Sequence, residues 1–221
     1  MTALNSLKRM QRSRWEKRYA VDNPLWRGAP DCDIPMPDGA IALELGCGDG
    51  KTLMGLITSN RTVVALDFSR RAVQSCHRRL GSNSMFHSLI SNVAFLPFSD
   101  ETFDVVVAFH ILEHLLDEDV SKTVAEIKRV LRPGGRAYVR TFSSEDMRFG
   151  AGKEVGKDTF VRGDGIVQRY FSMNELSDLF NAFEKESLEK HVIGKRFDGG
   201  PHKRVTLNGV FLRTRRTERK R

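Results

Sequence analysis

The sequence predicts an α/β fold: a Rossmann-like sheet of seven mostly parallel strands, with helices on both faces and an antiparallel C-terminal strand. Two observations predict it. Short apolar runs alternate with segments of helical periodicity, which is typical of a parallel sheet covered on both faces. A glycine-rich turn, GCGDG (46–50), directly follows the first apolar run, at the position where doubly wound folds bind a ligand.

The expected elements follow from these patterns in order. Five strands are expected over residues 41–45, 62–66, 85–90, 103–109 and 136–142. Three helices are expected between them, over residues 51–59, 69–80 and 119–131, and Pro133-Gly134-Gly135 ends the last of these. A helix over 172–183 and two strands, near 187–193 and 204–213, complete the fold.

Length and cysteine usage exclude several protein classes. The 221 residues are enough for one domain with a sizeable core. Cys32, Cys47 and Cys76 contain no C-x-x-C pair, so neither a disulfide scaffold nor a zinc ribbon is expected, and a reducing cytoplasmic location fits best. The basic N-terminus lacks the apolar core of a secretory signal, and no run approaches the ~20 apolar residues of a membrane span.

The positive charge is concentrated at the two ends of the chain. Lys and Arg number 36 against 28 Asp and Glu, a formal net charge of +8. Residues 1–20 and residues 213–221 each carry +5, which leaves −2 for the body between them. A polyanionic partner such as RNA would therefore be expected to meet the ends of the chain.

The residues around the glycine turn favour a particular ligand. The spacing G-x-G-x-G differs from the fingerprint of dinucleotide enzymes and from a phosphate-binding P-loop. Glu44 precedes the turn, where a carboxylate would repel a pyrophosphate but attract an ammonium group. Asp67 ends the second strand, where an acid can accept hydrogen bonds from ribose hydroxyls. A ligand with a ribose, an ammonium group and no phosphate is S-adenosylmethionine (SAM).

Four segments in order resemble the motifs of class I SAM-dependent methyltransferases, especially the ubiquinone/menaquinone-biosynthesis group. They are ELGCGDG, VVALDFSRRAV, NVAFLPFSDETFDVVVAFHILEHL and LRPGGRAYV, within residues 40–142. The resemblance implies that SAM is the cofactor and S-adenosylhomocysteine the product. It also implies a set of cofactor contacts: Gly46, Cys47, Gly48 and Gly50 beside methionine and ribose, Glu44 at the amino group, Asp67 at the ribose hydroxyls, and Phe68, Asn92 and Val93 around the adenine.

One cofactor position departs from the family pattern. Asn92-Val93 stands where family members commonly have Asp-Ala. An asparagine oxygen can still accept a hydrogen bond from the adenine amino group, and the backbone N–H of Val93 would meet an adenine nitrogen. The departure removes an ionic contribution without excluding SAM.

His110 to His114 match the H-x-x-E-H pattern of inverted zinc proteases. That chemistry needs an uninterrupted helix, whereas His110 directly follows an apolar strand, so we expect no metal. His110 is interpreted as a SAM contact or a general base, with a structural loop histidine as the alternative. Glu113 and His114 are expected to serve helix capping and packing.

The N-terminal segment, residues 1–39, is expected to form a helical cap over the cofactor. Trp15 and Tyr19 fall on one helix face, which would cover either the core or the cofactor, with Tyr19 near the acceptor. Related small-molecule methyltransferases carry a tryptophan in this segment, which implies that Trp26 lies over SAM and that Arg27 reaches its carboxylate.

The segment 145–171 is expected to form a flap over the acceptor site, between the core (40–144) and its C-terminal part (172–212). Arg148, Arg162, Arg169 and Tyr170 are the expected acceptor contacts. The run FVRGDGIVQRYFS (160–172) resembles a stretch of tRNA 3-methylcytidine methyltransferases. A structured flap with glycine turns is the alternative, and residues 213–221 are expected to form a basic tail.

The sequence therefore predicts a SAM-dependent methyltransferase whose acceptor is a small molecule. A tRNA or other RNA acceptor, bound through the basic ends, is the first alternative. A regulatory protein that binds SAM without turnover is the second. No membrane partner is expected, and the oligomeric state stays open.

Overall fold

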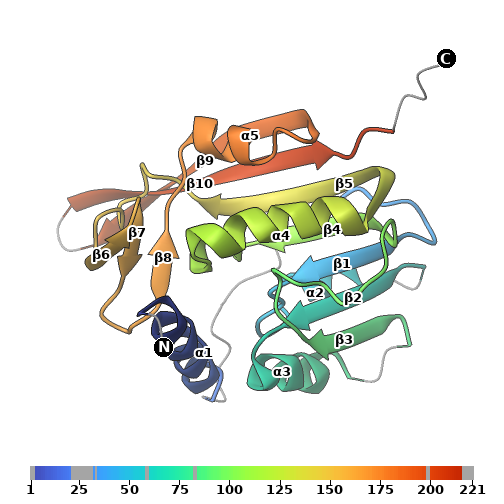
Figure 1. Ribbon diagram of the computed structural model, residues 1–221, viewed down its shortest axis with the longest axis horizontal. Coiled ribbons are helices and arrows are strands. Elements are labelled where there is room, and N and C mark those ends of the chain that lie inside the picture. The colour runs from blue at the N-terminus through green and yellow to red at the C-terminus, as the bar shows by residue number, and fades with distance from the viewer. Residues whose placement is uncertain are drawn as a thin grey trace.

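The computed structural model describes residues 3–20, 32, 34–57, 60–81, 84–197 and 200–215. Its centre is a seven-stranded sheet in the order β3-β2-β1-β4-β5-β10-β9 (Figure 1). The strands are β1 Ile41–Leu45, β2 Thr62–Asp67, β3 Phe86–Ile90, β4 Phe103–Phe109, β5 Leu131–Phe142, β9 Glu184–Phe197 and β10 Gly200–Leu212. Strands β1 to β5 pair in parallel, and β10 is antiparallel to β5 and β9. The predicted fold class is confirmed.

Helices cover both faces of this sheet because its strands are apolar on both. Helices α4 (Asp117–Val130) and α5 (Met173–Leu179) pack in one core, and α2 (Leu53–Leu56) and α3 (Arg70–Leu80) pack in the other. Strand β1 shows the alternation: Leu43 is buried in the first core and Ala42 in the second. Successive side chains of a strand point to opposite faces.

The strand register brings three chain segments to one edge of the sheet. Leu45 pairs with Leu66, and Glu44 pairs with both Ala65 and Val107. The loops that follow β1, β2 and β4 therefore leave the sheet side by side. The strand order also reverses between β1 and β4, which is where open α/β sheets bind ligands.

The segment 145–171 is more regular than its composition predicts. It contains a separate three-stranded antiparallel sheet of β6 (Lys153–Gly156), β7 (Thr159–Val161) and β8 (Val167–Arg169). The rings of Phe142, Phe160 and Tyr170 form a buried cluster beneath it. Strands of three or four residues are too short to show a clear period, which is why the sequence pattern missed them.

Element boundaries also differ from the predictions. Helix α2 has four residues rather than nine, and α5 ends at Leu179 rather than near residue 183. Strand β5 begins at Leu131, so the Pro-Gly-Gly turn lies inside it instead of before it. The C-terminal hairpin β9–β10 is longer than expected because its strands pair with each other beyond the end of β5.

The N-terminal helix α1 (Ala3–Arg18) lies between α3 and the small sheet (Figure 1). Gln11 fixes it to the small sheet: its side-chain amide donates to Gly165 O at 2.8 Å, and its side-chain oxygen accepts from Val167 N at 2.8 Å. On the other side, Glu16 accepts a hydrogen bond from Arg70 N at the start of α3. None of the helices in the described residues is long and apolar enough to cross a membrane.

Candidate functional site

The loop after β1 is a backbone cradle built on three glycines. Gly46, Gly48 and Gly50 have φ values of +70°, +54° and +84°, a region that favours glycine. The N–H groups of Gly46 and Cys47 both donate to Leu66 O, which ties the loop to β2. A Cβ at Gly48 would lie 2.8 Å from the Tyr19 hydroxyl, so any side chain there would fill the cradle.

Asp67 closes the cradle from the end of β2. Its two carboxylate oxygens accept hydrogen bonds from Gly48 N at 3.1 Å and from Ser69 N at 2.8 Å. Burial raises the pKa of Asp67 to about 6, against the lowering effect of these hydrogen bonds. Each oxygen keeps a further lone pair, so the carboxylate can still accept a pair of hydroxyl groups.

Glu44 is buried at the end of β1 beneath the same cradle. Burial raises its pKa to about 8, with a smaller opposing effect from the Thr52 hydroxyl. Its Oε2 atom has no hydrogen-bond partner among the described residues. A buried carboxyl group with an unused oxygen is suited to an ammonium ligand, which would restore its ionised form.

The loop between β3 and β4 forms the remaining wall. Asn92 is exposed, and its side-chain oxygen accepts a hydrogen bond from Ala94 N at 3.0 Å, while Val93 is buried. The asparagine oxygen is thus already engaged in a local turn, which the sequence did not predict. Phe68, after β2, is half-buried.

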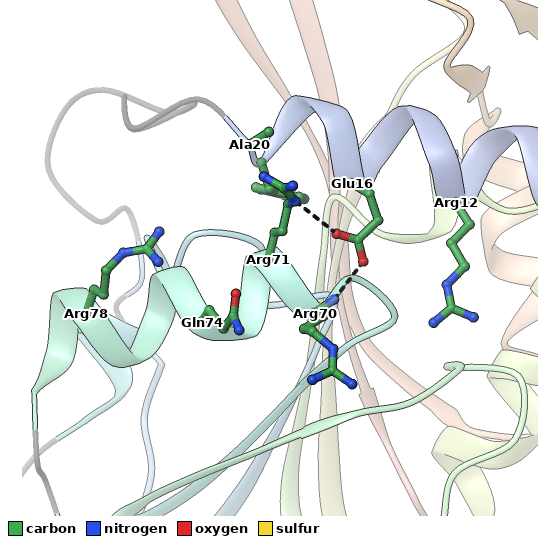
Figure 2. Close-up of a pocket in the computed structure, with 8 residues that line it drawn as sticks. Arg12, Glu16, Ala20, Arg70, Arg71, Gln74 and Arg78 are labelled. Atoms are coloured by element: carbon green, nitrogen blue, oxygen red, sulfur yellow. Dashed lines mark hydrogen bonds and ion pairs between the residues drawn. The ribbon is translucent and has the colours of Figure 1, made fainter.

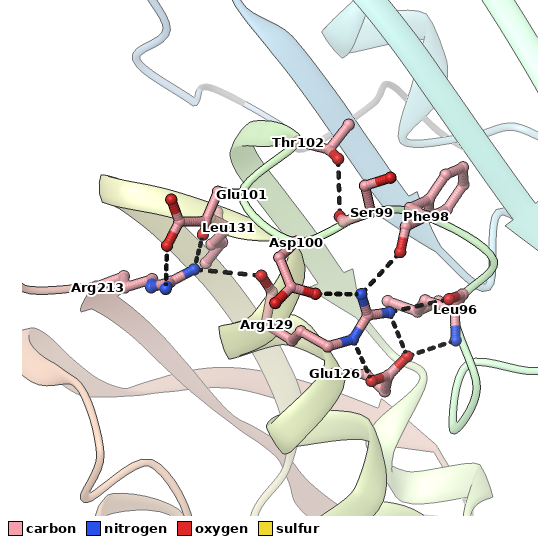
Figure 3. A network of polar contacts seen from close by, with 10 residues as sticks. All are labelled: Leu96, Phe98, Ser99, Asp100, Glu101, Thr102, Glu126, Arg129, Leu131 and Arg213. Atoms are coloured by element: carbon pink, nitrogen blue, oxygen red, sulfur yellow. Dashed lines mark hydrogen bonds and ion pairs between the residues drawn. The ribbon is translucent and has the colours of Figure 1, made fainter.

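Arg129 of α4 holds this loop in place (Figure 3). Its guanidinium donates to Phe98 O at 2.7 Å and to Leu96 O at 2.9 Å, and it forms ion pairs with Asp100 and Glu126. Hydrogen bonds from these carboxylates raise the pKa of Arg129. Local sequence patterns do not indicate this role, because the contacts to the loop cross about 30 residues of chain.

His110 follows β4 and lies in a loop, as predicted. It has a φ of +55°, which is uncommon for a residue with a side chain. Its Nδ1 atom lies 2.6 Å from the Glu113 carboxylate, whose other oxygen accepts from the Thr141 hydroxyl at 3.0 Å. Burial alone would raise the pKa of Glu113, but His110 and His114 outweigh it, and the net shift is downward.

This geometry bears on the capping and packing roles that the sequence predicted for Glu113 and His114. Glu113 is not a helix cap, because both of its oxygens bind side chains from the His110 loop and β5. His114 does pack, with its ring 4.8 Å from that of Trp15 and its Nδ1 atom 2.9 Å from Val167 O. Within the described residues, no group of three or more His, Cys, Asp or Glu side chains is arranged to hold a metal ion.

Comparison with known proteins agrees with this arrangement. Residues 43–139 match a family model described as a methyltransferase domain. Residues 43–139 thus form a methyltransferase domain, and the chain has the fold of SAM-dependent methyltransferases. The fold is shared with a SAM-dependent methyltransferase of Methanosarcina mazei, at a TM-score of 0.67 and 21% identity over 81% of this chain and 94% of that one.

Two sequence relatives of the methyltransferase domain differ in their acceptors. The tRNA N(3)-cytidine methyltransferase METTL2 of Gallus gallus is 28% identical over 77% of this chain and 49% of its own length. A demethylmenaquinone methyltransferase of Clavibacter sepedonicus is 32% identical over 56% of this chain and 49% of its own length. The chain thus spans about half the length of these relatives.

The N-terminal helix α1 and the residues that follow it lie beside the glycine cradle. The rings of Trp15 and Tyr19 are 5.7 Å apart and stacked, as their spacing predicted. Trp15 packs against His114, whereas Tyr19 reaches the glycine cradle. Trp26 and Arg27, the other expected contacts from this segment, lie outside the described residues.

Four of the five expected acceptor contacts lie in the segment 145–171, and they differ in burial and in their partners. Tyr170 is fully buried and donates to Arg148 O, and Arg169 is buried in ion pairs with Asp117 and Glu175. Both side chains are therefore engaged in contacts within the protein. Arg162 is half-buried and donates to the side chain of Gln168.

Arg148 lies over the ring of Phe142, together with a residue that the sequence did not indicate. Its guanidinium is 3.9 Å from the centre of the Phe142 ring, and that of Arg204 is 5.5 Å from the same ring. Both arginines pair with Asp146, whose side chain is fully buried. His110 lies 4.9 Å from Phe142, ring centre to ring centre. Arg204 is 56 residues from Arg148 in sequence, so local spacing could not have found it.

Proposed function

We propose that this protein transfers the methyl group of SAM to an RNA acceptor, with tRNA as the substrate class. The position of α1 carries the proposal. This basic helix lies between the glycine cradle and the loop that contains Arg162 and Asp164, and Arg18 forms an ion pair with Asp164 at 2.8 Å. The resemblance to tRNA N(3)-cytidine methyltransferases over 77% of the chain supports the same acceptor class.

The cradle fits SAM. The missing side chain of Gly48 keeps the cradle beside the Tyr19 hydroxyl unfilled by a Cβ, and the buried oxygen of Glu44 could accept a hydrogen bond from the ammonium group. Asp67 would hold the ribose hydroxyls, and Phe68, Asn92 and Val93 would border the adenine. SAM supplies an electrophilic methyl group on a sulfonium, which is a good leaving group, so positioning of the acceptor accounts for much of the catalysis.

His110 is placed to orient the acceptor or remove its proton. A hydrogen on Nδ1 can be donated to Glu113, which leaves Nε2 as a hydrogen-bond acceptor. With 39% of its side chain exposed, His110 is accessible from solvent. A nucleophile that carries a proton would use Nε2 as a general base, and one without a proton would use His110 only for positioning.

Arg148 and Phe142 would form the floor of the acceptor site. Proteins commonly hold a nucleobase by stacking it on aromatic rings or on arginine guanidinium planes. Arg148 already lies over Phe142 and is held there by Asp146.

The test measures methyl transfer from radiolabelled SAM to two acceptors in parallel reactions. One reaction contains in vitro transcribed tRNA, and the other contains the small-molecule fraction of a cell extract. Label in tRNA that is lost after ribonuclease treatment supports the proposal, and Asp67→Ala should abolish that label. Label only in small molecules would overturn it. SAM binding without transfer to any fraction would instead favour a non-catalytic regulatory protein.

A small acceptor is the second candidate. The resemblance to a demethylmenaquinone methyltransferase over 56% of the chain favours it. Arg148 and Arg204 could then bind a carboxylate or phosphate of that molecule by charge-assisted hydrogen bonds. The same labelling experiment distinguishes the two candidates: an RNA methyltransferase labels tRNA, whereas an enzyme with a small acceptor labels only the small-molecule fraction.

A further inference from the structure

A groove between α1 and α3 collects positive charge beside the glycine cradle (Figure 2). It has a volume of about 660 Å³ and is lined by Arg12 and Glu16 of α1 and by Arg70, Arg71, Gln74 and Arg78 of α3. Four arginines face one acid, so the lining carries a net charge of +3. Like charges crowded in one groove repel each other unless an anion occupies it.

The one acid of the groove is already engaged. Glu16 accepts a hydrogen bond from Arg70 N at 2.8 Å and forms an ion pair with Arg71 at 3.9 Å. These contacts join the two helices and leave the guanidinium groups of Arg12 and Arg70 without a carboxylate partner among the described residues. Both arginines are exposed and available to a ligand.

The groove is extended rather than compact. Arg70, Gln74 and Arg78 follow one another at intervals of four residues, so they share one face of α3. At a rise of about 1.5 Å per residue, the span from Arg70 to Arg78 is about 12 Å. A single carboxylate or phosphate would fill only part of this length, whereas consecutive phosphates of a nucleic acid strand match it.

The groove also opens beside the cofactor site. Tyr19, which lines it, places its hydroxyl against the glycine cradle. A strand held by its phosphates here would therefore pass next to the methyl donor.

We infer that this α1–α3 groove binds the phosphate backbone of the RNA acceptor. The inference rests on the proposed function and adds the surface that positions the RNA. Each guanidinium that neutralises a phosphate releases a condensed counterion, so the contribution of the groove appears in the salt dependence of binding.

The experiment measures tRNA binding by fluorescence anisotropy at several salt concentrations, with the full chain. The double variant Arg12→Gln/Arg70→Gln should make the negative slope of log K against log salt shallower by roughly 1.4 to 1.8, about 0.7 to 0.9 per lost phosphate contact. The control, Lys128→Gln/Lys195→Gln, removes the same charge from residues outside the groove. It should leave the slope unchanged, and both variants should bind SAM as the wild type does.

Two results would overturn the inference. Equal slopes for the groove variant and the control would show that the groove does not hold phosphates. Loss of binding to anionic lipid vesicles, with tRNA binding unchanged, would assign the groove to a membrane surface instead. If the wild type methylates tRNA but the groove variant shows the wild-type salt dependence, only the groove inference fails and the proposed function stands. If the wild type labels no RNA, the proposed function fails.

Discussion

The Nδ1 atom of His110 lies 2.6 Å from the carboxylate of Glu113, which is fully buried between the His110 loop and β5. A buried carboxylate in this position fixes both the ring orientation and the tautomer of the histidine. Thr141 donates to the second oxygen of Glu113, so the acid is held from two sides.

Glu113→Gln is therefore expected to reduce catalysis without reducing cofactor binding. The amide can no longer act as a charged partner for His110, and general-base or orientation effects of this kind are worth roughly 10²-fold in rate. Steady-state kinetics should show a lower kcat, with the Kd for SAM changed less than about twofold. Thr141→Val, which removes the second contact to Glu113, should have a smaller effect in the same direction. An unchanged kcat in Glu113→Gln would contradict a role for this pair.

Asp67→Ala is expected to weaken SAM binding. A hydrogen bond to a charged group contributes about 1.5–3 kcal/mol, so the loss of one such bond corresponds to roughly a tenfold to hundredfold higher Kd. Isothermal titration calorimetry measures this change. Asp38→Ala, at an exposed position outside the cradle, should bind SAM normally. Wild-type affinity in Asp67→Ala would show that the ribose is held elsewhere.

Glu44 should make SAM binding release a proton. Its pKa of about 8 means that it is protonated at pH 6.5, and a bound ammonium would favour the carboxylate. Calorimetry in buffers of different ionisation enthalpy should detect about one proton released near pH 6.5 and almost none at pH 9. Glu44→Gln should release none. Equal proton release by the wild type and the variant would exclude Glu44 as its source.

The same group should affect stability in the absence of SAM. The pKa of Glu44 is raised from 4.5 to about 8, so the folded state binds the proton more tightly than the unfolded state. This stabilisation is fully present below pH 4.5 and is lost as pH rises through about 8. The Tm of the wild type should therefore fall over this range relative to that of Glu44→Gln. If the Tm of the wild type and that of Glu44→Gln changed equally with pH, the raised pKa of Glu44 would be contradicted.

Arg129→Ala should destabilise the protein and loosen the loop that carries Asn92 and Val93. The substitution leaves the carbonyls of Leu96 and Phe98 without their donor. A loss of about 1–3 kcal/mol corresponds to a Tm lower by roughly 2–12 °C for a chain of this size. Lys128→Ala, the preceding residue of α4, serves as the control and should shift Tm by much less. A normal Tm for Arg129→Ala would mean that the loop does not depend on this arginine.

Arg148→Gln should act on the acceptor and not on SAM. The amide cannot provide the planar cation that lies over Phe142, so KM for tRNA should rise roughly tenfold while the Kd for SAM stays constant. Lys157→Gln removes an exposed charge from the small-sheet segment and should leave both constants unchanged. A higher Kd for SAM in Arg148→Gln would place this arginine in the cofactor site instead.

The two basic ends of the chain have different positions. The N-terminal basic residues lie on α1, beside the cradle and the small sheet (Figure 1). Arg213, at the start of the C-terminal basic segment, is fixed by an ion pair to Glu101 and by a hydrogen bond to Leu131 O (Figure 3). These partners lie at the start of β4 and β5, the opposite edge of the sheet from the cradle. Residues 216–221 lie outside the described residues.

The sequence by itself determined the sheet, the cradle and its two acids. These features depend on residues that are close in the chain or that end consecutive strands. Glu44 lies two residues before the first glycine, and Asp67 ends the next strand. Parallel strands joined by short crossovers bring such positions to one edge whatever the details of packing. The stacking of Trp15 on Tyr19 follows from helical spacing in the same way.

Only the tertiary structure decided how the surroundings of Arg148 and His110 are built. Arg148 and Arg204 form ion pairs with the same acid, Asp146. Gln11 forms hydrogen bonds with the small sheet, and Glu113 links His110 to Thr141. Tyr170 and Arg169, which the sequence placed at the acceptor, are instead buried in the packing of the small sheet. These contacts join segments that are far apart in the chain. Packing and burial in the folded protein bring such segments together, and local sequence patterns do not record this.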